Sequence, residues 1–130
     1  MTTVEETHAE VERLTVRPQL LFVRGGLSER RKSLVIQARR RRPAEGARAT
    51  VGKGFTATKK VGNAVIRNRA RRRLKAAARE LLPQLGVPGA DYVFIARMDT
   101  ADIGWQRLLD DMESALISLR AALNSGSGPA

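Results

Sequence analysis

Residues 63–81 form a strongly basic stretch that carries an apolar stripe at helical spacing. At 100° per residue, Ala70, Leu74, Ala77 and Leu81 fall within one narrow arc, which is typical of a helix that packs on a core. Positive side chains occupy most of the remaining circumference, and the only acid stands near the end of the stretch. The pattern predicts an amphipathic helix with a buried stripe and a cationic outer surface.

This helix places like charges next to each other. Pairs of cations stand four residues apart at 67/71, 71/75, 75/79 and 69/73, and each such pair costs an isolated helix about 0.2–0.5 kcal/mol. An ordinary solvated face mixes both signs. Arginine predominates here, and its planar fork matches phosphate oxygens. We therefore predict a polyanionic partner, with nucleic acid well ahead of a membrane surface because no Trp or Phe joins the apolar stripe.

The net charge of +11 is concentrated in the middle of the chain. Residues 13–79 hold 21 Lys and Arg against two acids, whereas residues 1–12 and residues 80–130 each carry a net −4. A basic block between acidic flanks is typical of a nucleic-acid-binding domain. The chain has no cysteine, no apolar run long enough to span a bilayer and no basic signal peptide, so we expect a cytoplasmic protein without disulfides.

The 130 residues predict one small α+β domain. We expect an acidic, disordered N-terminus over residues 1–12, a folded domain over residues 13–123 and a flexible tail over residues 124–130. The expected order of elements is α-β-β-α-β-α. Strands are predicted over 33–39, 49–59 and 91–97, and helices are predicted from Pro18 to Gly25, from Asn63 to Pro83 and from Ile103 to Leu123.

No pattern of catalytic residues stands out. The only histidine, His8, falls in the acidic N-terminus and is a poor candidate for a general base. Asp110, Asp111 and Glu113 could form a metal cluster, but the polar face of the last amphipathic helix explains them better. We expect the chain to contribute charge and shape, with no catalytic residue and no metal ligand.

Residues 53–75, KGFTATKKVGNAVIRNRARRRLK, resemble the signature of the protein subunit of bacterial ribonuclease P. The resemblance continues more weakly over residues 13–123. It implies a four-stranded sheet with helices packed on one face and a left-handed βαβ crossover through the basic helix, like the second domain of ribosomal protein S5. Because the sequence pattern indicates only three strands, residues 49–59, alone or with the preceding loop, would have to supply the fourth.

The resemblance also implies a function. Ribonuclease P removes the 5′ leader of precursor transfer RNA, and its catalytic RNA subunit holds the Mg²⁺ and performs the hydrolysis. The chain would then be a noncatalytic, RNA-binding subunit whose partners are that RNA and precursor transfer RNA, and neither DNA nor a membrane. The motif and the basic helix predict RNA contacts at Lys59, Lys60, Asn63, Arg67, Asn68, Arg69, Arg71, Arg72, Arg73 and Lys75.

The expected cleft for the leader is less typical of the family. Members usually carry aromatic side chains there, on which bases stack. Alignment places Leu20, Arg24 and Gln37 at those positions. Phe22 is near, and could belong either to the core or to the cleft.

Three other functions remain open. A ribosomal or ribosome-associated RNA-binding protein of the same fold would keep the basic helix but has no need of KKVGNAVIRNR. A DNA-binding module would need several base-reading side chains, and Asn68 alone among the cations is a poor reader. A nuclease acting alone would need acids, bases or metal ligands within the chain.

Overall fold

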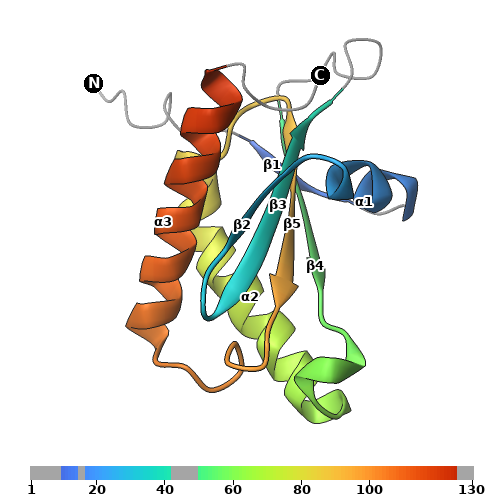
Figure 1. Ribbon diagram of the computed structural model, residues 1–130, viewed down its shortest axis with the longest axis vertical. Coiled ribbons are helices and arrows are strands. Elements are labelled where there is room, and N and C mark those ends of the chain that lie inside the picture. The colour runs from blue at the N-terminus through green and yellow to red at the C-terminus, as the bar shows by residue number, and fades with distance from the viewer. Residues whose placement is uncertain (1–9, 15–16, 42–49, 126–130) are drawn as a thin grey trace.

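The computed structural model describes residues 10–14, 17–41 and 50–125. Strands and helices alternate irregularly along this part of the chain (Figure 1). In chain order the elements are β1 (Val11–Arg13), α1 (Arg17–Arg24), β2 (Leu27–Arg30), β3 (Leu34–Arg40), β4 (Val51–Thr56), the 3-10 turn η2 (Lys59–Val61), α2 (Ala64–Leu85), β5 (Ala90–Ala96) and α3 (Trp105–Asn124).

The strands form one mixed sheet in the order β1-β4-β5-β3-β2. β1, β4 and β5 run parallel, whereas β3 is antiparallel to β5 and β2 is antiparallel to β3. β5 lies in the centre, and all of its residues except Ile95 are buried. A strand buried on both faces appears in the sequence as a nearly continuous apolar run, as YVFIA does after Asp91.

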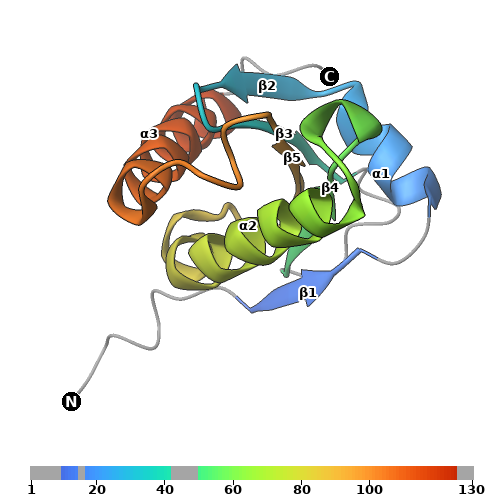
Figure 2. The same cartoon turned by 90° about the horizontal axis from the view of Figure 1, so that it is seen from below.

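The two faces of the sheet carry different helices. Figure 2 shows α2 and α3 side by side on one face and α1 on the other. Successive strand residues point to opposite faces, so Phe94 joins the main core with Leu74 and Leu116. Val93 instead packs with Val23 of α1 in a smaller cluster on the opposite face.

The connection from β4 through α2 to β5 crosses over with the uncommon hand. β4 and β5 are parallel neighbours, and such connections are almost always right-handed. Figures 1 and 2 together show a left-handed crossover here, as the resemblance implied. The mixed sheet with its packed helices confirms the predicted α+β class.

Two expectations about the sheet need correction. The sheet has five strands instead of four, and residues 49–59 supply only β4. The strands that sequence reasoning missed, β1 and β2, are only three and four residues long, too short for a clear apolar alternation. The helices also do not all share one face, because α1 covers the other side of the sheet.

The chain boundaries and one helix end differ as well. Val11 and Glu12 belong to β1, so ordered structure begins before residue 13; residues 1–9 and 126–130 lie outside the described residues. Pro83 does not stop α2, which continues to Leu85. Leu82 is buried in the core and its carbonyl accepts from the Gly86 N–H, so the last turn persists although proline provides no N–H.

Two residues of α3 show how tertiary contacts decide burial. Trp105 opens the helix at the edge of the fold, and its exposed fraction is 37%. Asp111 was expected on a solvated face but is buried, where the Ser33 hydroxyl donates to its Oδ2 at 2.9 Å. Helical periodicity alone could not show that the β2–β3 turn covers this position.

Candidate RNA-binding surface

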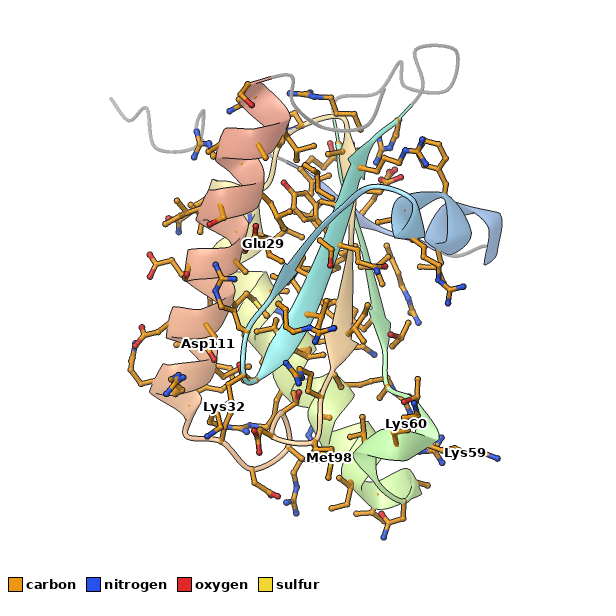
Figure 3. All side chains as sticks on the ribbon, viewed as in Figure 1. Glu29, Lys32, Lys59, Lys60, Met98 and Asp111 are labelled. Atoms are coloured by element: carbon orange, nitrogen blue, oxygen red, sulfur yellow. The ribbon has the colours of Figure 1, made fainter. Side chains whose placement is uncertain are left out.

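The position at which α2 begins is fixed by a side-chain cap and by the turn that precedes it. Asn63 is the N-cap, and its Oδ1 accepts a hydrogen bond from the Ile66 N–H at 3.0 Å. The preceding Gly62 adopts φ of 150°, a conformation that favours glycine. Lys59 extends outward from η2 just before this cap (Figure 3), and Lys60 beside it is also exposed. Positive side chains therefore surround a helix N-terminus, where the macrodipole already favours anions.

The flank of α2 that faces α3 is occupied by contacts within the protein. Arg73 donates from its two terminal nitrogens to the carbonyls of Thr100 and Ile103, at 2.6 and 2.5 Å. Its guanidinium also lies 5.9 Å from the centre of the Trp105 ring. Arg73 was predicted to bind RNA, but its donors hold the loop between β5 and α3, so we assign it a structural role.

Arg69 lies on the same flank but remains accessible. Its Nη1 is 3.2 Å from Asp102 Oδ1, and both side chains are largely exposed, at 44% and 75%. An exposed ion pair of this kind contributes only about 0–1 kcal/mol. A phosphate group can therefore compete with Asp102 for Arg69.

The remaining cations of α2 point away from α3. Asn68 and Arg72 are exposed, and Arg71 donates to Asn68 Oδ1 at 2.6 Å, so the Asn68 amide N–H groups have no acceptor among the described residues. The Arg67 Nε is buried and has no hydrogen-bond partner among the described residues. We call the side chains on this side the outer face of α2: Arg67, Asn68, Arg71, Arg72, Lys75 and Arg79.

The structure brings together only part of the predicted leader cleft. Leu20 and Gln37 both face the α1 side of the sheet, where Leu20 packs near Val93 and Gln37 pairs in register with Val93. Arg24 is exposed at the last turn of α1. Phe22 is not a bare aromatic platform, because the Arg39 guanidinium lies 4.1 Å above its ring centre and donates to the Phe22 carbonyl.

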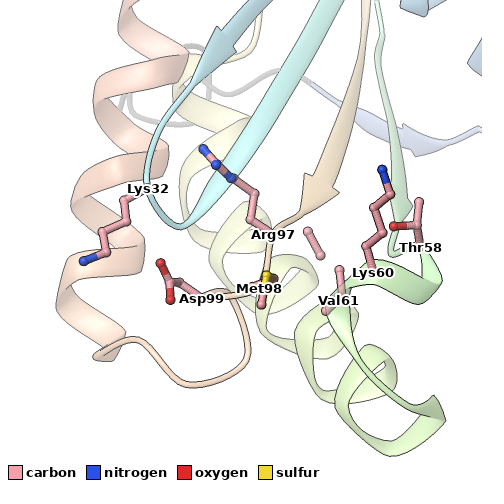
Figure 4. A pocket seen from close by; sticks show the side chains of 8 residues that line it. Lys32, Thr58, Lys60, Val61, Arg97, Met98 and Asp99 are labelled. Atoms are coloured by element: carbon pink, nitrogen blue, oxygen red, sulfur yellow. The ribbon is translucent and has the colours of Figure 1, made fainter.

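A hollow of about 440 Å³ opens at the end of the sheet beside η2. Lys60 and Val61 of η2 line one side, and Lys32 with the loop after β5 lines the other (Figure 4). Three cations and one acid contribute to its wall, namely Lys32, Lys60, Arg97 and Asp99. The sequence analysis did not name Arg97 or Lys32 as candidate binding residues. Arg97 directly follows the buried strand β5, and Lys32 directly follows Arg30 and Arg31, and these positions could have indicated them.

The acidic residues do not form a metal centre in the described part of the chain. No three His, Cys, Asp or Glu side chains there gather in a way that could hold a metal ion. Burial would raise the pKa of Asp111, but hydrogen bonds from Arg107 and Ser33 and the charge of Arg107 lower it overall. Asp111 is therefore a structural anion. Within the same ranges, no helix is long and apolar enough to cross a membrane.

These features define a small α+β domain that exposes a cationic helix beside its sheet. The sequence model of the family described as Ribonuclease P matches residues 10–120. The chain therefore belongs to the ribonuclease P protein family, and its role is that of an RNA-processing subunit.

Sequence relatives agree with this assignment, and solved structures share the fold. The ribonuclease P protein component of Caulobacter vibrioides is 50% identical over 115 residues, covering 88% of this chain and 75% of the relative. That of Ruegeria pomeroyi is 53% identical over 90 residues, covering 68% and 70%. Among solved structures, the Thermotoga maritima RNase P protein has a TM-score of 0.67 at 20% identity, covering 82% of this chain and 96% of that one. A mutant Staphylococcus aureus RNase P protein has a TM-score of 0.69 at 19% identity, covering 90% and 92%.

Proposed function

We propose that this chain is the noncatalytic, cytoplasmic RNA-binding subunit of ribonuclease P. In this proposal the outer face of α2, with Lys59, Lys60 and Asn63, binds the catalytic RNA, and the α1 side of the sheet holds the 5′ leader of precursor transfer RNA. The RNA subunit holds the Mg²⁺ that hydrolysis requires. The family assignment supports the role, and the distribution of charge supports the surfaces.

The observation that carries the proposal is that the cations on the outer face of α2 form no ion pair with any acid that the structure describes. Elsewhere in the described structure arginines meet acids, as in Arg41–Asp91 and Arg107–Asp111. Arg72 and Lys75 are exposed and make no side-chain ion pair with any described residue. Repulsion between neighbouring cations is relieved when phosphates approach, so RNA binding gives this surface its physical explanation.

The α1 side of the sheet suits a single-stranded leader for a different reason. The stacked Arg39 guanidinium offers a flat, charged surface above Phe22, and arginine planes stack on unpaired bases as aromatic rings do. Leu20 and Gln37 add an apolar contact and an amide. We infer that this family member contacts the leader through guanidinium stacking where relatives use aromatic rings.

Salt dependence tests the contact with the catalytic RNA. Each phosphate that the protein neutralises contributes roughly −0.7 to −0.9 to the slope of log K against log[salt]. We expect Arg72→Ala to weaken binding and to reduce the slope by about one unit. The matched control is Arg120→Ala on α3, which should leave the slope unchanged. A wild-type affinity that does not respond to salt would overturn the proposal.

A cleavage assay tests the division of labour. The protein alone, with Mg²⁺ and precursor transfer RNA, should release no leader, and addition of the RNA subunit should produce cleavage. The effect of the protein should be greatest at low Mg²⁺, where its charge reduces repulsion between two RNAs. Leader release by RNA-free protein, abolished by a point substitution in it, would contradict the noncatalytic role.

The leader contact has its own test. The assembled enzyme should bind precursor transfer RNA more tightly than mature transfer RNA, and shortening the leader to one or two nucleotides should remove the difference. Arg24→Ala and Arg39→Ala should reduce this preference by about 1 kcal/mol each if their guanidinium groups stack on or pair with the leader. Gln37→Ala should do less, because an amide offers little stacking area. Equal binding of both transfer RNAs by the wild type would remove the cleft from the proposal.

A further inference from the structure

A second group of cations converges where β1 and β4 meet α2. Arg13 and Lys53 are register partners in the parallel β1–β4 pair, so they lie side by side on the sheet. Val51 and Phe55, two residues on either side of Lys53, both pack in the main core. Lys53 therefore points to the α2 side of the sheet, opposite to α1.

Lys75 and Arg79 complete this group from the helix. They stand one turn apart on α2, and with Arg13 they are close enough to Lys53 to repel its charge. We define the edge cluster as Arg13, Lys53, Lys75 and Arg79. It joins the outer face of α2 to the open edge of the sheet, because β1 is the outermost strand on that side.

Lys53 is surrounded by charges of its own sign and forms no ion pair with any acid that the structure describes. Burial and the charges of Arg79, Arg13 and Lys75 lower the pKa of Lys53 below its ordinary value of 10.5. On β5, Tyr92 lies in register with Lys53, and its hydroxyl accepts a hydrogen bond from the Val87 N–H. No side chain of the edge cluster forms an ion pair or a side-chain hydrogen bond with any residue that the structure describes.

Two other arginines, which lie next to the ends of strands, are paired with acids. Arg41 bonds to Asp91 at 2.7 Å, and Arg31 bonds to Glu29 at 2.9 Å. Glu12 lies next to Arg13 in β1 but points to the opposite face, toward Arg41. The edge cluster thus gathers positive charge from three elements and lacks the acids that accompany cations nearby.

We propose that the edge cluster is a phosphate-binding site for the backbone of the catalytic RNA, separate from the contacts of the arginine-rich first half of α2. The proposal rests on the proposed function and names a new part of its interface. The RNA would follow the outer face of α2 and continue around its flank onto the β1 edge. The leader is not the ligand, because the cluster faces away from α1.

The first experiment compares salt slopes for binding of the RNA subunit alone. Removal of two phosphate contacts in the double variant Arg13→Gln/Lys53→Gln should reduce the slope by roughly 1.4–1.8 units. A fourfold rise in salt should then weaken the variant about tenfold less than it weakens the wild type. Arg120→Gln serves as the control and should keep the wild-type slope.

The outcomes separate this proposal from the proposed function. An unchanged slope for the double variant, with a reduced slope for Arg72→Gln, would overturn the edge cluster and leave RNA binding by α2 intact. Unchanged slopes for both would overturn both. A loss of preference for precursor over mature transfer RNA in the double variant, with normal binding of the RNA subunit, would show that the cluster serves the leader and would also overturn the proposal.

A second measurement does not depend on substitutions. The pKa of the Lys53 ammonium can be followed by NMR in protein labelled on lysine side-chain carbons, with and without the RNA subunit. A bound phosphate stabilises the charged form, so the pKa of Lys53 should rise on binding. An identical pKa in the free and bound protein would overturn the proposal.

Discussion

The two long helices on the same face of the sheet, α2 and α3, both pack an apolar stripe on the strands but expose outer surfaces of different charge. Both bury an apolar stripe against the strands, represented by Leu74 in α2 and Leu116 in α3. Beyond their stripes they differ, because α2 carries seven cations and one acid whereas α3 carries two cations and three acids.

The polar groups of α3 largely satisfy one another. Gln106 donates to Asp110, and Arg107 donates to Asp111, which also accepts from Ser33. On α2 the cations that bond to other elements are confined to the flank beside α3, at Arg69 and Arg73, and on the outer face Arg71 donates to Asn68 of the same helix. In both helices the buried stripe serves the fold, whereas the outer charge of α2 is left for the RNA contact that we propose.

The largest expected effect tests the claim that the two stripes are equivalent. Leu74→Ala and Leu116→Ala each remove a fully buried side chain and should each lower the free energy of unfolding by about 2–5 kcal/mol. Urea unfolding measures both. The salt slope of RNA binding should stay at the wild-type value in the folded fraction of each variant. A cost confined to one helix would show that the stripes are not equivalent.

Arg73→Ala tests whether a cation of α2 can belong to the fold. The substitution removes charged hydrogen bonds to two backbone carbonyls, and such bonds contribute about 1.5–3 kcal/mol to stability. We expect a loss of that size in urea unfolding, whereas Arg72→Ala should change stability by less than about 0.5 kcal/mol. Arg73→Lys should not restore the wild type, because an ammonium cannot reach both carbonyls as a planar fork does. Equal stabilities of the Arg73 and Arg72 alanine variants would refute the structural role.

The contribution of Asp111 on α3 to the stability of the fold should depend on pH. Its pKa in the folded protein lies below the ordinary value of 3.8, so its charged form stabilises the fold above that value. This contribution is lost as the pH falls from about 3.8 through the lower folded pKa. Asp111→Asn should cost about 1–3 kcal/mol at neutral pH, and the difference from the wild type should shrink in acid. A difference that is constant down to pH 2 would contradict this account.

The smallest expected effect concerns the exposed pair between Arg69 and Asp102. Because both side chains are largely exposed, Asp102→Ala should change the free energy of unfolding by no more than about 1 kcal/mol. It also frees Arg69, so the affinity for the RNA subunit should rise slightly at low salt. Asp110→Ala on α3 is the matched control, since it removes an exposed acid that contacts no cation of α2. Weaker RNA binding in the Asp102 variant would be the opposite of the expected sign.

Much of the fold could be predicted from local pattern. The apolar stripe of α2, its Asn63 cap, the buried strand β5 and the helix α3 all follow from spacing and from the chemistry of helix ends. The basic motif also indicated the family, which the sequence comparisons confirm. These features depend on residues that are neighbours along the chain, so the sequence by itself determined them.

The tertiary structure decided which charges have partners within the protein. Helical spacing places Arg73 nearer to the apolar stripe than Arg72, but only the folded chain shows that the loop before α3 captures the first and leaves the second exposed. Asp111 is buried because the distant Ser33 folds over it. The edge cluster likewise forms only when β1 pairs with β4 beside α2, so no local pattern could reveal it. Charge compensation acts through space across long sequence separations, and that is why it required the folded chain.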